Sequence, residues 1–440
     1  MPPGRRGGSE AITRRGSERV RILILSWEYP PRIVGGLGRH VWRLSTSLAA
    51  AGHEVHVVTR DHPDAPAEEM LDGVHVVRAA ADPETVPFED LIPWVLQFNV
   101  AVLERATALM REVEIDVAHA HDWLVAYAAA AVKNIFGVPL VATIHATEYG
   151  RHQGWLPGPM NKLIHQVEWW LTYESRRTIT CSQYMHDVCR DIFQLPAAKM
   201  DIVPNGVDLD TFGEPDGVAE FRAERLAPSE KLIFFAGRLE YEKGVQTVLD
   251  ALPRVRERVP ARFVVAGVGT HLDALREHVA RDGLGDAVEF LGFVPDEDLR
   301  MWYGAADLAV VPSLYEPFGM VALETMASGT PCIAADTGGL RELIVHDETG
   351  LRFVPGDPAS LAAAMLRILT DRRLDKRLVV DARRMLDDQF SWRSIAARTT
   401  DVYRQAAREE DDLRRSQRAD DRPPLRAMLG RSPLLGSVNP

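Results

Sequence analysis

The sequence has few cysteines, no long apolar run and no excess of basic residues. Its three cysteines (Cys181, Cys189 and Cys332) are too few and too scattered for a disulfide framework or a zinc site. No run of 18 or more apolar residues is present, so we expect no transmembrane helix and no integral membrane association. The polar, Arg- and Gly-rich first 19 residues lack the apolar middle of a signal peptide. These absences predict a cytoplasmic protein.

The charge balance is acidic, with a net charge of −12. A general nucleic-acid-binding protein carries a basic surface, so this balance predicts no nucleic-acid partner, although local cations can still bind a phosphate. Apolar residues make up 46% of the chain and charged residues 26%, which is typical of a folded globular protein. A length of 440 residues suggests two or three domains.

Apolar strand-like segments alternate with helical segments in two successive halves. The first half contains strand patterns at 20–25, 54–59, 74–78, 117–120, 140–144, 177–180 and 201–203. The second half contains strand patterns at 231–236, 263–266, 288–291, 308–312 and 331–334. Alternation of this kind predicts an α/β protein with two doubly wound, parallel sheets, that is, two Rossmann-like domains.

We divide the chain into five segments. They are a disordered tail at 1–19, a first domain at 20–204, a second domain at 205–388, one helix at 389–410 and a disordered tail at 411–440. The helix follows from an amphipathic pattern that places Trp392, Ile395 and Tyr403 on one side. The second tail follows from its charge, its prolines and its loss of periodicity. The sequence does not predict an oligomeric state.

The most informative segment contains two carboxylates, Glu316 and Glu324, separated by seven residues. We expect Glu316 in a loop after a strand, and Glu324 about two turns into the helix that follows. The helical part of this gap spans about 8–10 Å, too far for a paired acid and base but comparable with the sugar-to-ribose span of a nucleotide sugar. The backbone N–H groups of Phe318, Gly319 and Met320 lie at the helix start, where oxygen-rich ligands are favoured.

Each half begins with a glycine-containing loop. Gly35 and Gly36 lie between the first strand and a helix, where the backbone can approach a phosphate closely, but an ordinary tight turn fits equally well. In the turn Gly237–Gly244, Arg238 and Lys243 can neutralise a departing diphosphate. The alternative for that turn is ordinary surface charge.

Histidine and aspartate side chains follow two strands of the first half. His145 and Asp122 come at strand ends, where ligands gather in doubly wound sheets, although a single histidine there is more often structural than catalytic. His119 and His121 have the spacing of metal ligands. We expect their side chains on opposite faces of the strand, and the sequence therefore predicts no metal site.

Together these segments resemble the retaining glycosyltransferases of the glycogen-synthase-like family 4 group, whose two Rossmann-like domains form the GT-B fold. The likeness covers about residues 20–405 and includes the motif segments Gly237–Gly244, Glu316–Glu324, Val203–Asp208 and Thr337–Leu340. One departure is Ile33-Val34, where many of these enzymes carry a lysine. The segments most similar to actinobacterial α-1,4-glucosyltransferases of glycogen and methylglucose polysaccharide synthesis are Ser26–Pro31, Gly36–His40 and Ile144–Glu148.

The resemblance implies a reaction and a distribution of roles. An α-glucosyl unit would pass from a nucleoside-diphosphate glucose to an α-glucan or related oligosaccharide, with retention and without a metal or other cofactor. The nucleotide would bind the second domain, the acceptor the first, and a late helix would cross back to the first domain. The implied catalytic residues are Glu316, His145, Arg238 and Lys243. The implied donor-binding residues are Gly35, Gly36, Arg238, Lys243, Val294, Glu316, Phe318, Gly319, Met320 and Glu324, with Asp122 on the acceptor side.

Three alternatives remain open at this point. The same fold could transfer mannose or another sugar to a phosphorylated or lipid-linked acceptor, or it could bind glycans without catalysis. A dinucleotide oxidoreductase is disfavoured, because the first glycine loop is not G-x-G-x-x-G and no suitable acidic residue closes the second strand. The nucleotide base, the acceptor length and the linkage are not encoded in these motifs.

Overall fold

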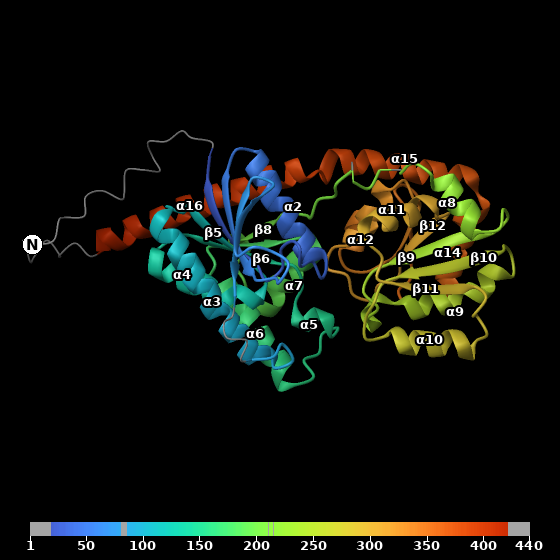
Figure 1. Ribbon diagram of the computed structural model, residues 1–440, viewed down its shortest axis with the longest axis horizontal. Helices are drawn as coiled ribbons and strands as arrows, with labels where there is room; N and C mark the ends of the chain where they lie inside the picture. The colour runs from blue at the N-terminus through green and yellow to red at the C-terminus, as the bar shows by residue number, and fades with distance from the viewer. Residues whose placement is uncertain (1–18, 81–85, 210, 214, 421–440) are drawn as a thin grey trace, which may run out of the picture.

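The computed structural model describes residues 19–80, 86–209, 211–213 and 215–420. Two α/β domains lie side by side along the long axis of the molecule (Figure 1). Of the tail expected at 1–19, only Arg19 lies within the described residues, and residues 421–440 lie outside them. Among the described helices, none combines the length and the apolar character needed to cross a membrane.

The first domain contains an eight-stranded sheet with the order β3-β4-β2-β1-β5-β6-β7-β8. All its neighbouring strands pair in parallel, except that β3 is antiparallel to β4. The strands are β1 (Arg21–Leu25), β2 (Glu54–Arg60), β3 (Glu68–Leu71), β4 (Val74–Ala79), β5 (Val117–His121), β6 (Leu140–Ile144), β7 (Arg177–Thr180) and β8 (Met200–Ile202). The edge strand β3 was not predicted, because it begins with two glutamates and no residue in it is fully buried.

Helices cover both faces of this sheet (Figure 1). They are α2 (Gly36–Ala50), α3 (Leu91–Glu112), α4 (Ala126–Phe136), α5 (Glu148–Arg151), α6 (Pro159–Glu174), α7 (Gln183–Phe193) and α16 (Trp392–Asp420), with short 3₁₀ turns η1 (Trp123–Val125) and η2 (Ala197–Lys199). The amphipathic pattern explains their packing: in α2, the buried residues Val41, Leu44 and Leu48 recur at helical spacing. Each such side chain contributes about 1.5–3 kcal/mol by burial.

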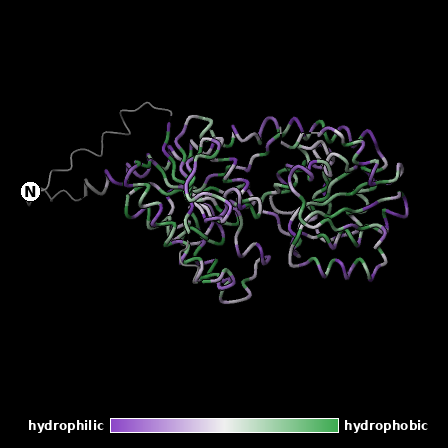
Figure 2. Tube along the Cα trace, viewed as in Figure 1, coloured by the Kyte–Doolittle hydropathy of each residue, from purple (hydrophilic) through white to green (hydrophobic). Residues whose placement is uncertain are grey.

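The second domain contains a parallel six-stranded sheet with the order β11-β10-β9-β12-β13-β14. Its strands are β9 (Lys231–Ala236), β10 (Ala261–Ala266), β11 (Val288–Gly292), β12 (Leu308–Val311), β13 (Cys332–Ala335) and β14 (Leu351–Phe353). Its helices are η3 (Tyr241–Lys243), α8 (Val218–Arg225), α9 (Val245–Arg256), α10 (Leu272–Arg281), α11 (Asp296–Ala305), α12 (Met320–Ala327), α13 (Leu340–Leu343), α14 (Pro358–Thr370) and α15 (Arg372–Gln389). Hydrophobic residues concentrate along the strands of both sheets, and hydrophilic residues along the outer helices (Figure 2).

The predicted α/β class with two doubly wound domains is therefore confirmed. The chain passes from the first sheet to the second between Ile202 and Lys231 and returns between Gln389 and Trp392. The Val207 N–H donates to the Phe390 carbonyl oxygen at 2.9 Å, so the two crossings lie side by side.

The last helix, α16, packs back onto the first domain as expected (Figure 1). Trp392, Ile395 and Tyr403 are buried against the β1 region. The expected helix end at 410 and the disordered tail from 411 are wrong, because α16 continues to Asp420. Its charged end stays helical because acids and bases recur at helical spacing, as in the pair Glu410–Arg414 at 3.5 Å.

Candidate active site

The loop between β12 and α12 carries the first carboxylate of the motif. The Lys243 ammonium donates to Glu316 Oε2 at 2.8 Å, and the Ser313 hydroxyl donates to the same oxygen at 3.2 Å. Lys243 comes from η3, at the end of the glycine-bounded turn that follows β9. The structure thus brings together two of the residues predicted to act on the donor. Arg238, from the same turn, is half exposed and lies 3.7 Å from the Glu242 carboxylate.

The second carboxylate, Glu324, lies buried inside α12 and contacts the other domain. Its Oε1 accepts a hydrogen bond from the Arg39 guanidinium at 2.9 Å, and the same guanidinium contacts Asp296 at the start of α11. Burial raises the pKa of Glu324, while Arg39 acts in the opposite direction. The predicted ribose ligand is therefore held by a cation of the first domain in this structure.

Gly319 allows the backbone to turn from the loop into α12. Its φ of +113° is a left-handed conformation that side chains disfavour, and a Cβ there would lie 2.6 Å from the Leu340 side chain. Because α12 begins at Met320, the N–H groups of Met320 and Val321 have no carbonyl partner within the helix. Those of Ala322 and Leu323 donate to the Gly319 carbonyl oxygen at 3.0 and 3.2 Å. The Gly339 N–H donates to the Glu316 carbonyl oxygen at 2.9 Å, and this bond helps to hold the loop between β12 and α12 in place.

The first glycine loop is engaged by a carboxylate of the chain itself. Glu28 Oε2 accepts the N–H groups of Val34 at 2.8 Å and Gly35 at 3.2 Å. Glu28 is buried, and burial raises its pKa. Gly36 faces the second domain, since a Cβ there would lie 3.4 Å from the Met320 side chain. The donor-binding roles of Gly35 and Gly36 stay predictions.

Asp122 and His145 meet at the carboxyl ends of β5 and β6. Asp122 Oδ1 accepts the backbone N–H of His145 at 2.8 Å. Burial raises the pKa of Asp122 to about 6 and lowers the pKa of His145 to about 3. The imidazole is therefore neutral near pH 7 and suited to hydrogen bonding with a sugar hydroxyl rather than to charge stabilisation.

The expectation that His119 and His121 lie on opposite faces of β5 is wrong. Residues two apart in a strand share a face, and the two ring centroids lie 4.1 Å apart. His119 bonds Tyr403 and Thr143, each at 2.7 Å. His121 Nδ1 lies 3.0 Å from His145 Nε2, so it joins the predicted site.

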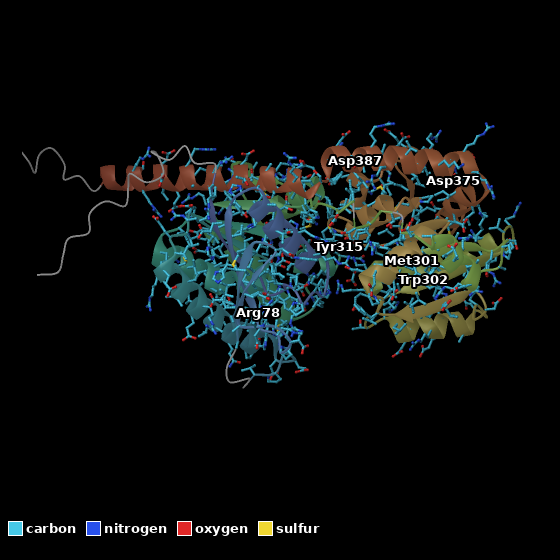
Figure 3. The ribbon with its side chains drawn as sticks, turned by 45° about the horizontal axis from the view of Figure 1, so that its top comes forward. Arg78, Met301, Trp302, Tyr315, Asp375 and Asp387 are labelled. Atoms are coloured by element: carbon cyan, nitrogen blue, oxygen red, sulfur yellow. The ribbon has the colours of Figure 1, made fainter. Side chains whose placement is uncertain are left out.

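Tyr315 joins the two domains beside Glu316. Its side chain lies between the domains (Figure 3) and is only 6% exposed. Its hydroxyl lies 3.4 Å from the Thr147 N–H. The Cys181 sulfur contacts the carbonyl oxygens of His145 at 4.0 Å and Pro317 at 3.8 Å. The strand-end loop that carries His145 and the loop that carries Glu316 therefore meet across the domain boundary.

Further contacts hold the second domain against α7. The Ser182 hydroxyl donates to the Pro317 carbonyl oxygen at 2.7 Å. The Glu342 carboxylate accepts the N–H groups of Gln183 and Tyr184, each at 2.8 Å, at the positive end of α7. Hydrogen bonds from α7 therefore hold the two domains together in addition to the contacts of Tyr315.

Two cavities lie on or between the domains. A cavity of about 30 Å³ lies between the domains beside Arg39, Asp296 and Glu324. A larger one of about 320 Å³ lies on the first domain at the carboxyl ends of β2 and β4. Val294, predicted to lie near the nucleobase, is half buried in the loop between β11 and α11. Its donor role stays a prediction.

Sequence reasoning assigned no role to Arg39, Glu28 or Tyr315. A signal for Arg39 was present, because it is a cation near the N-terminus of α2, where the helix dipole disfavours positive charge. This unfavourable interaction with the helix dipole indicates that Arg39 has an anionic partner elsewhere in the fold. No sequence pattern identifies that partner, since Glu324 lies 285 residues away.

Removing Arg39 should destabilise the protein. Arg39→Ala leaves the buried Glu324 carboxylate without its cation, and we expect the free energy of unfolding to fall by about 2 kcal/mol, less than for a fully enclosed pair because Arg39 is partly exposed. Urea denaturation measures the loss. The control is Arg190→Ala, which removes an exposed arginine paired with Asp187 and should leave the midpoint unchanged. Equal midpoints for Arg39→Ala and wild type would contradict a stabilising ion pair.

Comparisons with known proteins agree with this geometry. Residues 34–211 match the Glycosyltransferase Family 4 family, and residues 218–385 match Glycosyl transferases group 1. A glycogen synthase of Mycobacterium tuberculosis is 41% identical over 406 residues, which span 89% of this chain and 96% of that protein. A D-inositol 3-phosphate glycosyltransferase of Frankia alni is 35% identical over 390 residues, 84% of this chain and 95% of that protein.

A solved structure shares the whole two-domain arrangement. The sucrose-phosphate synthase of Thermosynechococcus elongatus superposes with a TM-score of 0.76 at 28% identity, covering 88% of this chain and 99% of that one. The matches extend over both domains, in agreement with the motifs found in each. The chain therefore belongs to the group 1 glycosyltransferases of GT-B fold, with a family 4 N-terminal region.

Proposed function

We propose that this glycosyltransferase moves an α-glucosyl unit from a nucleoside-diphosphate glucose to an α-glucan or related oligosaccharide, with retention of configuration. The 2.8 Å contact between Lys243 and Glu316 carries the proposal. It places a cation and a carboxylate beside the first turn of α12, where a sugar and its leaving diphosphate would meet. The identity of 41% with a glycogen synthase supports glucose and a glucan as the substrates.

In the proposed reaction, the cations of the second domain take the negative charge of the leaving group. The bond between the anomeric carbon and the diphosphate oxygen breaks, and the acceptor hydroxyl attacks from the same face. The departing phosphate oxygen takes the hydroxyl proton, so no separate base is needed. Lys243 and Arg238 neutralise the diphosphate, which makes a metal ion unnecessary, and Glu316 stabilises positive charge developing on the sugar.

The first domain supplies the neutral His145 and the Asp122 carboxylate that holds its backbone. The His145 imidazole forms a hydrogen bond with a hydroxyl group of the sugar nucleotide, and Asp122 holds the loop that carries His145. Contacts such as Ser182 to Pro317 keep the domains closed, which excludes water and limits hydrolysis of the donor.

The rate of transfer should fall at acidic pH, and the pKa of Asp122 should set the midpoint of this fall. Because its raised pKa is about 6, the carboxyl is protonated below that pH and accepts the His145 N–H less strongly. We expect kcat/KM to fall as the pH decreases through about 6 and to lose this dependence in Asp122→Asn. A pH–rate profile of both proteins is the measurement. An unchanged acid limb in the variant would contradict the assignment.

The larger cavity fits the acceptor. It lies at the same carboxyl edge of the sheet as Asp122, and its wall contains Phe88, Trp94 and Gln97. The Arg60 guanidinium lies over the Trp94 ring at 4.6 Å. Aromatic surfaces with a few polar groups at the rim are typical of pockets for small ligands, and a sugar ring presents both kinds of surface.

Shortening the exposed aromatic of this wall should affect the acceptor alone. We expect Phe88→Ala to raise the acceptor KM by about 3- to 10-fold, from the loss of one aromatic contact, and to leave the donor KM unchanged. Tyr173→Ala is the matched control, since Tyr173 is also exposed on the first domain but lies on α6, away from the cavity. A higher donor KM for Phe88→Ala, or an unchanged acceptor KM, would place the acceptor elsewhere.

A second acceptor class has support from several relatives. The 35% identity with a D-inositol 3-phosphate glycosyltransferase favours a phosphorylated acceptor as the alternative. UDP-glucose and ADP-glucose, each offered with a maltooligosaccharide and with D-inositol 3-phosphate, distinguish the two. We expect a lengthened maltooligosaccharide; transfer to the inositol phosphate alone would contradict the glucan proposal. The cytoplasmic location stays a prediction.

A further inference from the structure

A cluster of imidazoles lies at the carboxyl ends of β5 and β6 and includes His145 of the proposed donor site. His40 from α2, His121 from the end of β5 and His145 from the end of β6 meet there, and one ring nitrogen of each lies within 4.8 Å of those of the other two. The ring centroids of His40 and His145 are 4.8 Å apart, and those of His121 and His145 are 5.3 Å apart. We propose that these three histidines form a binding site for one divalent transition-metal ion of the zinc class.

The cluster contains nitrogen atoms that the protein leaves without a partner. Among the described residues, His40 Nδ1 and His121 Nε2 are buried and make no hydrogen bond. The two side chains belong to residues that are 3% and 0% exposed. An unpartnered buried nitrogen is costly, and either atom would gain a partner where it faced the ion. The ion would also replace the existing contact between His121 Nδ1 and His145 Nε2, which lie 3.0 Å apart.

The ligand chemistry suits a transition metal. The cluster offers imidazole nitrogens, the commonest metal ligands in proteins. Neutral imidazoles favour zinc, copper or nickel, whereas Mg²⁺ prefers oxygen ligands.

The geometry requires only a small adjustment. Zinc–nitrogen bonds of about 2.0–2.1 Å place two nitrogens on one ion roughly 3.3–3.5 Å apart. Each ring would therefore move by about 1 Å or less to take up a tetrahedral arrangement. His145 is less completely buried than the other two histidines. A fourth ligand, such as a water molecule, would complete the coordination.

A second group in the described residues serves as the comparison. Asp250, His278 and Asp282 also bring ligand atoms within 4.8 Å of one another, on the outer surface of the second domain. There the His278 Nε2 already lies 3.0 Å from both carboxylates, and the carboxylates are exposed. This surface group has one imidazole instead of three, so we expect it to bind zinc weakly.

The consequence for catalysis rests on the proposed function. An ion on His145 would remove that imidazole from the donor sugar, so the ion inhibits transfer rather than assisting it. Zn²⁺ should stop transfer by the wild-type protein, and a chelator should restore it. Transfer by His40→Phe, whatever its rate, should be insensitive to the Zn²⁺ concentration that stops the wild type.

Calorimetric titration of Zn²⁺ into the chelator-treated full chain, without donor or acceptor, tests the site independently of the reaction. We expect one ion per chain, no competition from Mg²⁺, and affinity lowered at least about tenfold in His40→Phe and in His121→Phe. His278→Ala should bind as the wild type does. Phenylalanine keeps the ring packing of the cluster, and thermal melting checks that each variant is folded.

Anomalous scattering at the zinc edge from soaked wild-type crystals needs no variant. A peak between the three imidazoles would support the site. No saturable binding by the wild type, undiminished affinity in the folded phenylalanine variants, or loss of binding in His278→Ala would overturn it. If zinc binds as expected but no sugar is transferred, the metal site stands and the proposed function fails.

Discussion

Lys243→Ala should lower the rate of glucosyl transfer by about 100- to 1,000-fold, the effect of removing one preorganised group that stabilises a developing charge. The ammonium lies 2.8 Å from Glu316 Oε2 and is only 20% exposed, so water cannot fully replace it. Steady-state kinetics with saturating acceptor measures the loss. We expect the fall mainly in kcat, because charge on the diphosphate is greatest as the bond to the sugar breaks.

The control for this variant is another paired lysine. Lys231 also donates to a carboxylate, Asp307 Oδ1, at 2.8 Å, but it lies at the first residue of β9, the edge of the sheet opposite the site. Lys231→Ala should therefore retain turnover. Near-normal kcat in a folded Lys243→Ala protein would remove the leaving-group role from the proposal.

Glu324→Ala should weaken donor binding by about 10- to 100-fold. A charge-assisted hydrogen bond contributes about 1.5–3 kcal/mol, and a buried carboxylate can accept from a ribose hydroxyl once it is free of Arg39. Titration calorimetry with the nucleoside diphosphate measures the change without turnover. An unchanged dissociation constant would end the ribose assignment.

The variant Arg39→Ala distinguishes ribose binding by Glu324 from its ion pair with Arg39 between the domains. If Glu324 acted only through Arg39, then Arg39→Ala would weaken donor binding as much as Glu324→Ala does. We expect instead that Arg39→Ala binds the nucleotide at least as well as wild type, because the carboxylate no longer has to be released. The double variant should resemble Glu324→Ala, since the ribose contact is lost in both.

The regular elements were predictable because their periodicity is strong and local. The strand limits predicted at 140–144, 177–180 and 231–236 coincide with those of β6, β7 and β9. These strands are almost wholly buried in parallel sheets, and β6 and β9 are mainly apolar. The helix from Met320 also followed from the sequence, since its apolar residues begin directly after Gly319.

The contacts between distant segments were not predictable. The pairing of Arg39 with Glu324 and the insertion of Tyr315 against Thr147 join opposite domains, and no local pattern encodes such pairs. The end of α16 was misjudged because its charges were treated as a sign of disorder, whereas their spacing stabilises a helix. His119 and His121 were wrongly placed on opposite faces of β5. The two-residue repeat of a strand places them on the same face, where their rings meet.

Proton NMR of the first product formed from UDP-glucose or ADP-glucose with a maltooligosaccharide tests retention and metal independence most directly. We expect a new glucosyl residue with an α anomeric proton, formed without added metal in the presence of a chelator. A β anomeric proton in that first product would contradict the retaining mechanism, and transfer only after a divalent cation is added would contradict the role given to Lys243 and Arg238.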